Sequence, residues 1–236
     1  MSTLTPKKRE IKDRERKILA FARPMIVREG YHGLNMDRIA EKLKYSKGTI
    51  YNHFSCKEEI VIALAIENAA KRVELFQKAA QFKGPPRHRM NAIGLACEIF
   101  VQAYPDYFQF ERILNLPSVR EKTSEKRQSI VRDCELGCMS IVAGLVRDAI
   151  AAEDLVLAKK FTPEKLVFGL WSLVTGAYSI ALSSDSLTQM GLDDPFAAVH
   201  DHTSALMDGF DWQPLSDEYD LNKLHKKIQK EVFKNE

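Results

Sequence analysis

The residues best suited to chemistry lie between positions 47 and 53, and that chemistry is hydrogen bonding rather than catalysis. The stretch contains lysine, threonine, tyrosine, asparagine and histidine, with Ile50 as its one aliphatic residue. If it forms a helix with Ile50 turned inward, the other side chains are left outside, where they suit phosphates and base edges. Lys47 and Asn52 are the candidates for base contacts, since lysine favours guanine acceptors and an asparagine amide can pair with adenine. Gly48 carries no chemistry but lets a backbone approach closely.

Two short helices are needed to present this face. Ile39, Ala40 and Leu43 are spaced as the apolar side of one helix, and Ile50 and Phe54 as that of a second. Three residues separate the two helices, and such a pair on so brief a turn forms a helix-turn-helix.

The ends of these helices have capping residues. Asn35 is placed to cap the first helix and Ser46 the second, because their side-chain oxygens can accept from orphan amides of the first turn. A helix over 7–29 is expected before them, with a kink at Pro24 and an end at Gly30. A further helix is expected from about position 57 to Phe82.

This stretch resembles the signature of the tetracycline-repressor (TetR) family over roughly the first 65 residues. The resemblance rests on Gly30-Tyr31, Ile39-Ala40, the run from Ser46 to Phe54, and Lys57-Glu58. It implies a recognition helix in the major groove and phosphate contacts from Thr49, Tyr51, His53 and Lys57.

The resemblance also implies that the first turn of the supporting helix, Asn35 and Met36, faces the sugar-phosphate chain. Met36 departs from the family, which usually has a hydroxyl or a small residue there. Two candidates have structural alternatives, because His53 can pack beneath Phe54 and Tyr51 can support the helix instead of touching DNA.

The charge distribution agrees with a nucleic-acid partner at one end. The net charge is only +3, but residues 1–57 hold 14 Lys/Arg against 6 Asp/Glu, and the remainder hold 21 against 26. A basic N-terminal part attached to a mildly acidic one fits DNA binding at one end and another task at the other. The four cysteines have no zinc-ribbon spacing, so reduced thiols are expected.

The rest of the chain has helical periodicity and helix punctuation throughout, which predicts an all-α fold. Long helices are expected from Ser118 to about Ala152, from Pro163 to about Leu182 and from Pro195 to about Gly209, with a shorter amphipathic helix in the tail. The predicted domains are a helix-turn-helix domain (1–57), a connecting helix and linker (58–86), a larger helical regulatory and dimerisation domain (87–212), and a C-terminal amphipathic helix (213–236).

The resemblance further implies that the last two helices of the regulatory domain pair with their copies in a homodimer; a core helix in a monomer is the alternative. A small apolar or amphipathic effector is expected among the helices of residues 87–210. Aromatic residues are the candidates to line its site, although aromatics at helical spacing usually belong to a core: Phe100, Tyr104, Phe108, Trp171 and Tyr178.

These features predict a cytoplasmic DNA-binding regulator, a repressor of a palindromic operator released by its effector. A DNA-bound adaptor that recruits a protein without an inducer is the alternative. No catalytic motif, cofactor fingerprint or membrane span is recognisable, so no enzyme activity, cofactor or membrane partner is expected. His200 and His202 could start a metal site, but residues two apart diverge on a helix, so no metal is expected either.

Overall fold

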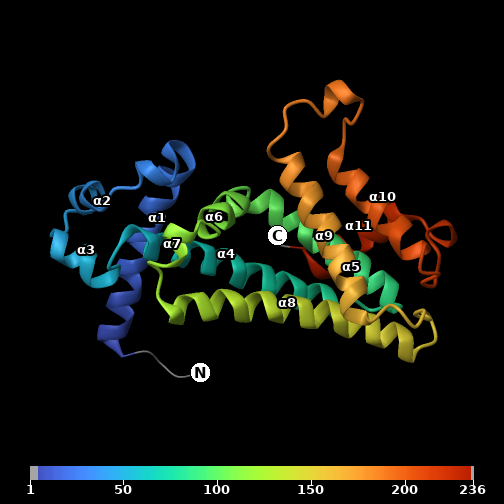
Figure 1. Cartoon of the computed structure of the whole chain (residues 1–236). Coiled ribbons are helices and arrows are strands. Elements are labelled where there is room, and N and C mark those ends of the chain that lie inside the picture. The colour runs from blue at the N-terminus through green and yellow to red at the C-terminus, as the bar shows by residue number, and fades with distance from the viewer. Residues whose placement is uncertain (1–4, 235–236) are drawn as a thin grey trace. The chain divides into compact units, whose positions relative to one another are not determined.

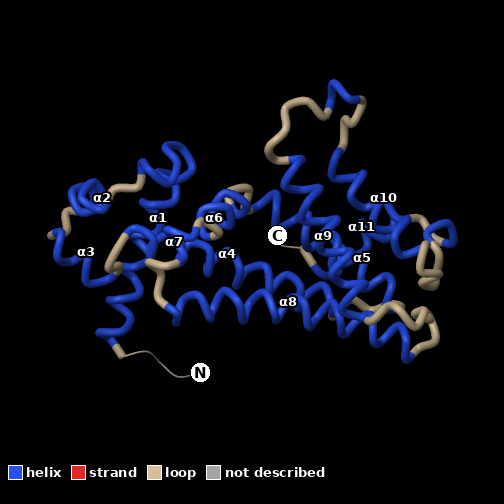
Figure 2. The backbone as a smooth tube through the Cα atoms, viewed as in Figure 1, coloured by secondary structure: helices blue, strands red, loops and turns tan. Residues whose placement is uncertain are grey.

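The computed structural model describes residues 5–234, and within that range the chain is helical, with eleven α-helices, two 3-10 helices and no strand. Figure 2 shows helices joined by loops and turns. The predicted all-α fold is therefore confirmed. The ends of the two terminal predicted domains, residues 1–4 and 235–236, lie outside the described residues.

Figure 1 labels most of the helices in chain order. Their bounds are α1 (Pro6–Gly33), α2 (Met36–Leu43), α3 (Lys47–His53), α4 (Lys57–Ala80), α5 (Pro86–Ala103), α6 (Tyr107–Leu114), α7 (Pro117–Arg120), α8 (Glu125–Ala151), α9 (Pro163–Ala181), η1 (Thr188–Met190), α10 (Pro195–Asp208), η2 (Ser216–Glu218) and α11 (Leu221–Val232).

The first helix is interrupted at Gly30 rather than at Pro24. Gly30 has φ 72° and ψ −178° and is the non-helical residue inside α1, whereas Pro24 lies within the helical part. A positive φ costs glycine little, because it has no Cβ. The predicted end at Gly30 is thus confirmed, although its ψ is extended rather than left-handed helical.

The chain divides into two compact units. The first contains the described residues up to Ala69 together with Asp106–Arg132, and the second contains Ala70–Pro105 and the described residues from Asp133 onward. Because α4 and α8 are continuous across these limits, each helix contributes to both units. The segment 106–132, which the sequence placed with the regulatory part, returns to the unit that contains the helix-turn-helix.

The first unit is built on one apolar core. Ile18, Ile39 and Ile50 are each fully buried in it, and Phe110 from α6 and Val119 from α7 belong to the same cluster. Burial of such side chains contributes about 1.5–3 kcal/mol each. The late segment is therefore part of the support for the helix-turn-helix.

The second unit is joined by buried polar contacts as well as apolar packing. Arg87 of α5 is fully buried and donates hydrogen bonds to the carbonyl of Trp212 and, at 2.5 Å, to Oδ1 of Asp208. His200 of α10 is also buried, with Nε2 2.7 Å from Glu98 Oε2 of α5. His200 is thus an internal contact between helices rather than a surface histidine.

The long helix that was expected from Ser118 begins later. Residues Pro117–Arg120 form the single-turn helix α7, and α8 starts at Glu125. The intervening turn is closed by the Thr123 hydroxyl, which donates to the Arg120 carbonyl at 2.8 Å. The other predicted helices are present, including the tail helix α11. Among the described residues, no helix is both long and apolar enough to cross a membrane.

Candidate nucleic-acid interface

The helix-turn-helix is formed by α2 and α3, and both predicted caps are present. Asn35 Oδ1 accepts from the amides of Asp37 at 2.9 Å and Arg38 at 3.1 Å. Ser46 Oγ accepts from the amide of Thr49 at 3.1 Å. These bonds satisfy amides that have no partner inside the helix and so define where each helix starts.

Helix α3, the expected recognition helix, has one buried residue, Ile50, and exposes four of the others. Ile50 is fully buried, whereas Tyr51 is 48% exposed, and Lys47, Gly48 and Asn52 are also exposed. An alanine Cβ at Gly48 would come no closer than 3.9 Å to a neighbouring side chain, so the open space there belongs to the outer surface. The structure thus presents these candidates on one short helix.

Lys47 is held by a partner that sequence reasoning missed. Its Nζ lies 2.6 Å from Asp37 Oδ2 of α2, and both side chains are more than half exposed. The hydrogen bond and the charge of Asp37 raise the pKa of Lys47. Because exposed ion pairs are worth at most about 1 kcal/mol, this pair can open when a base edge or a phosphate competes for the lysine.

Three of the predicted DNA-contact residues, Met36, His53 and Lys57, are partly or largely buried or have partners inside the first unit. The Met36 side chain is only 8% exposed and belongs to the core of the first unit, so its backbone amide alone can meet a phosphate. The His53 side chain is 9% exposed, with Nδ1 3.6 Å from Glu15 Oε1 of α1. Lys57 donates to the Tyr31 carbonyl at 3.3 Å, and its ammonium lies 4.1 Å from the Tyr31 ring centroid.

The hydroxyl of Thr49 is also engaged, 2.8 Å from the hydroxyl of Ser46. Either oxygen of this pair retains the capacity to bond a phosphate, because a hydroxyl both donates and accepts. Thr49 is half-buried and therefore lies at the edge of the exposed face.

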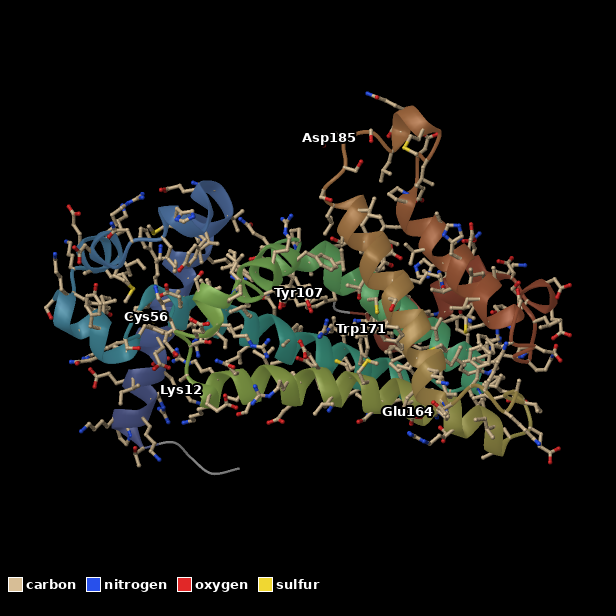
Figure 3. The ribbon with its side chains drawn as sticks, viewed as in Figure 1. Lys12, Cys56, Tyr107, Glu164, Trp171 and Asp185 are labelled. Carbon is tan, nitrogen blue, oxygen red and sulfur yellow. The ribbon has the colours of Figure 1, made fainter. Side chains whose placement is uncertain are left out.

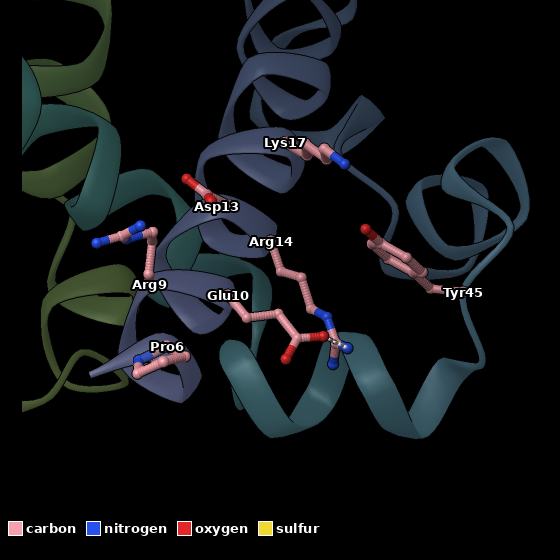
Figure 4. A pocket seen from close by; sticks show the side chains of 7 residues that line it. All are labelled: Pro6, Arg9, Glu10, Asp13, Arg14, Lys17 and Tyr45. Atoms are coloured by element: carbon pink, nitrogen blue, oxygen red, sulfur yellow. Dashed lines mark hydrogen bonds and ion pairs between the residues drawn. The ribbon is translucent and has the colours of Figure 1, made fainter. Parts of the chain in front are cut away.

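A hollow of about 530 Å³ lies beside the helix-turn-helix, between α1 and the turn that contains Tyr45. Figure 4 shows the Arg14 and Lys17 side chains of α1 and the Tyr45 ring around the same open space, which Pro6, Arg9, Glu10 and Asp13 also line. Arg14 is paired with Glu10 at 2.5 Å. The charge count had indicated that residues 1–57 are basic, but it did not single out Tyr45, for which the available signal was its position directly before the cap Ser46.

The five aromatic residues predicted to line the effector site do not form a single cluster of rings. Two of the predicted rings, Phe100 and Tyr104, contact each other. The other three contact rings outside the predicted set: Phe108 with Tyr107, Trp171 with Phe168, and Tyr178 with Phe196.

These rings differ widely in exposure. Phe100 and Tyr178 are buried, and Trp171, labelled in Figure 3, is 46% exposed on α9. Phe108 lies on α6 in the first unit, whereas the other four belong to the second. A common effector site for these residues stays a prediction.

Comparison with known proteins places the helix-turn-helix in a family. Residues 18–64 match the family model described as bacterial regulatory proteins, tetR family. Over 66 residues the chain is 39% identical to the transcriptional repressor AcnR of Corynebacterium diphtheriae, a match that covers 28% of this chain and 35% of AcnR. Over 99 residues it is 28% identical to the transcriptional activator FasR of Mycolicibacterium smegmatis, covering 42% of each protein. The chain thus matches about a third to two fifths of the length of these relatives.

Solved structures resemble a larger part of the chain. A TetR/AcrR-family regulator from Thermobifida fusca aligns with a TM-score of 0.63 and 21% identity, covering 84% of this chain and 98% of that one. A transcriptional regulator from Saccharomonospora viridis, solved in complex with choline, aligns with a TM-score of 0.64 and 17% identity, covering 84% and 96%. At these identities the likeness shows the fold alone.

The fold and the capped, outward-facing helix α3 define a helix-turn-helix domain attached to a larger helical body. Residues 18–64 are therefore similar to the DNA-binding domain of the tetR family of bacterial regulatory proteins.

Proposed function

We propose that this protein represses transcription by binding a palindromic DNA operator as a homodimer, and that a small apolar or amphipathic effector releases it. The observation that carries the proposal is the outer face of α3. Lys47, Tyr51 and Asn52 are exposed there, whereas Ile50 of the same helix is fully buried in the core. Such a face supplies donors and acceptors for base edges and phosphates. The family match at residues 18–64 supports it.

The proposed contacts divide by chemistry. Lys47 and Asn52 read base edges, and Gly48 allows the helix close to the groove. Backbone phosphates are held by Thr49, Tyr51 and Lys57, with the amides of the α2 first turn at Asn35 and Met36. His53 is mostly buried against Glu15 and contributes through its remaining exposed edge. Two copies about 34–36 Å apart, or a larger multiple, would read a palindrome.

Selection of binding sites from random duplex DNA tests the specific part of this proposal. The expected result is an enriched palindrome whose half-sites are separated by about one helical turn or a multiple of it. Binding to that sequence should fall steeply with added salt, because phosphate neutralisation releases counterions. Recovery of no preferred sequence would show that specific operator recognition is wrong.

The homodimer is proposed to form through α9 and α10. These helices pack together, with Leu206 of α10 3.9 Å from the position of a Cβ on Gly169 of α9. On α9, Phe168 is 60% exposed and Trp171 is 46% exposed, with ring centroids 6.2 Å apart. Exposed aromatic pairs of this kind are typical of the centre of an interface.

Replacing both Phe168 and Trp171 by glutamate is therefore expected to convert the protein to a monomer, because two carboxylates would be buried without partners at the interface. Sedimentation equilibrium should give twice the 26.9 kDa chain mass for the parent and the single mass for the variant. Val156→Glu is the control, since Val156 is 82% exposed in the loop after α8. A double variant that remains dimeric would place the interface elsewhere.

The effector is proposed to bind in the second unit, among the helices that contain Phe100, Trp171 and Tyr178 and beside Tyr104, the C-cap of α5. The choline complex of the Saccharomonospora viridis protein supports the idea that this fold can hold a small molecule. Ligand binding to the native state alone raises thermal stability, by about 2.7 kcal/mol at a concentration 100 times the Kd. A thermal-shift screen of apolar and amphipathic compounds in which none raises the melting temperature would contradict this part.

A further inference from the structure

The first turn of α4 contains two adjacent carboxylates that are nearly inaccessible. The Glu58 and Glu59 side chains are 4% and 9% exposed. Buried carboxylates are costly unless paired, so their partners identify contacts on which the local structure depends. Both sets of partners include residues from the late segment 106–132, which lies outside the matched family region 18–64.

Glu58 connects the end of α1 to the turn before α8. It accepts a hydrogen bond from the Tyr31 hydroxyl at 2.5 Å, and Lys122 Nζ lies 3.5 Å from the same carboxylate oxygen. Burial by itself raises the pKa of Glu58, but the net effect of its surroundings is to lower that pKa. The Tyr31 hydrogen bond and the charge of Lys122 are among the interactions that lower it. Glu58 therefore stays ionised in place.

Glu59 is held more closely, by the first turn of α8. Its carboxylate accepts from Nη1 of Arg127 at 2.6 Å, from the amide of Ser124 and, at 3.4 Å, from the Ser124 hydroxyl. Nη1 of Arg127 also donates to the Glu59 carbonyl at 2.9 Å. Such charge-assisted bonds fix the guanidinium in one orientation.

The same guanidinium lies against the residue that ends the recognition helix. Arg127 Cζ is 4.8 Å from the ring centroid of Phe54, which is the C-cap of α3 and is 1% exposed. A cation over an aromatic face at this distance is attractive, more so where water is excluded. Arg127 thus connects α8, α4 and the base of α3 within the first unit.

We propose that Arg127 is a positioning residue for DNA recognition, holding α3 at its groove-binding angle through Glu59 and Phe54. The proposal rests on the operator binding proposed above and assigns to α8 a part in it.

The test compares Arg127→Met with Arg127→Lys in operator binding and in hydrogen exchange of the α3 amides. Methionine preserves apolar cover of Phe54 but leaves Glu59 unpaired, whereas lysine restores the charge. We expect Arg127→Met to lower operator affinity about tenfold, since small displacements of positioned groups weaken recognition strongly. Affinity for random duplex DNA should change less than about twofold, because it depends mainly on charge. Arg127→Lys should recover most of the loss.

Arg132→Met is the matched control, because Arg132 lies on the same helix but its pair with Glu125 is exposed. If Arg127→Met does not fold, Glu59→Gln replaces it, since the amide keeps a neutral contact to Ser124 and Arg127. Faster exchange of α3 amides in Arg127→Met than in Arg132→Met supports the proposal even without DNA.

The outcomes separate this inference from the proposed function. Unchanged operator affinity and unchanged α3 exchange, in a parent that binds its operator, would overturn the role of Arg127 and leave the function intact. If the parent selects no operator, the function fails and the exchange comparison alone decides the positioning role. Equal losses on operator and random DNA, with no rescue by lysine, would also overturn it.

Discussion

Replacing Tyr51 by alanine is expected to weaken operator binding at least about 100-fold while leaving the fold intact. A hydrogen bond to a charged phosphate is worth about 1.5–3 kcal/mol, and a symmetric dimer loses it in both half-sites. Every 1.4 kcal/mol is a factor of about ten. Because Tyr51 is 48% exposed and its neighbour Ile50 holds the helix, the melting temperature should hardly change.

The pattern of the loss distinguishes a phosphate contact from a base contact. Tyr51→Ala should lower affinity for all duplexes alike, since phosphates carry no sequence information. Lys47→Ala should instead relax the preference at one or two bases, where a good lysine contact discriminates by about 1–3 kcal/mol. Competition binding against single-base operator variants measures both effects.

Leu116→Ala is the control for this series, because Leu116 is 46% exposed in the first unit but lies outside the helix-turn-helix. It should bind the operator like the parent. If Tyr51→Ala also binds like the parent, the tyrosine supports the helix or faces solvent, and the phosphate role assigned by resemblance is wrong.

The second large effect is expected at Arg87, where Arg87→Met should destabilise the protein by about 3–5 kcal/mol, the usual cost of breaking a buried ion pair. The Arg87 side chain is fully buried and serves the carbonyls of Trp212 and Ser204 as well as Asp208. Methionine fills similar space but leaves these acceptors without their donor. Because a buried acceptor without a partner keeps its desolvation cost, the loss exceeds that of one ordinary hydrogen bond.

Thermal unfolding at a fixed protein concentration measures this loss, since dimerisation makes the melting temperature concentration-dependent. For a chain of this size the shift should be about 10 °C. Arg147→Met is the matched control: its ion pair with Glu164 of α9 is more than half exposed on both sides, so it should cost less than about 1 kcal/mol. If Arg87→Met changes the melting temperature only slightly, water replaces the arginine as the hydrogen-bond donor to these acceptors.

The local sequence determined where the helices lie, where α2 and α3 begin and which face of α3 is exposed. The spacing of apolar residues specified the helices, and Asn35 and Ser46 specified where α2 and α3 begin, because a cap acts on amides only two or three residues away. The exposed face of α3 followed from the same periodicity, which turned Ile50 inward and left Lys47, Tyr51 and Asn52 outside.

The tertiary structure decided what depends on distant partners. Met36 looked like a contact residue by position, yet its side chain is in the core, and His53 faces Glu15 of α1. The return of 106–132 to the first unit and the placement of Arg127 on Phe54 join residues more than 60 positions apart. Periodicity reports which face of a helix is apolar, but the neighbour that covers that face is set by packing between elements, and a single sequence does not encode it locally.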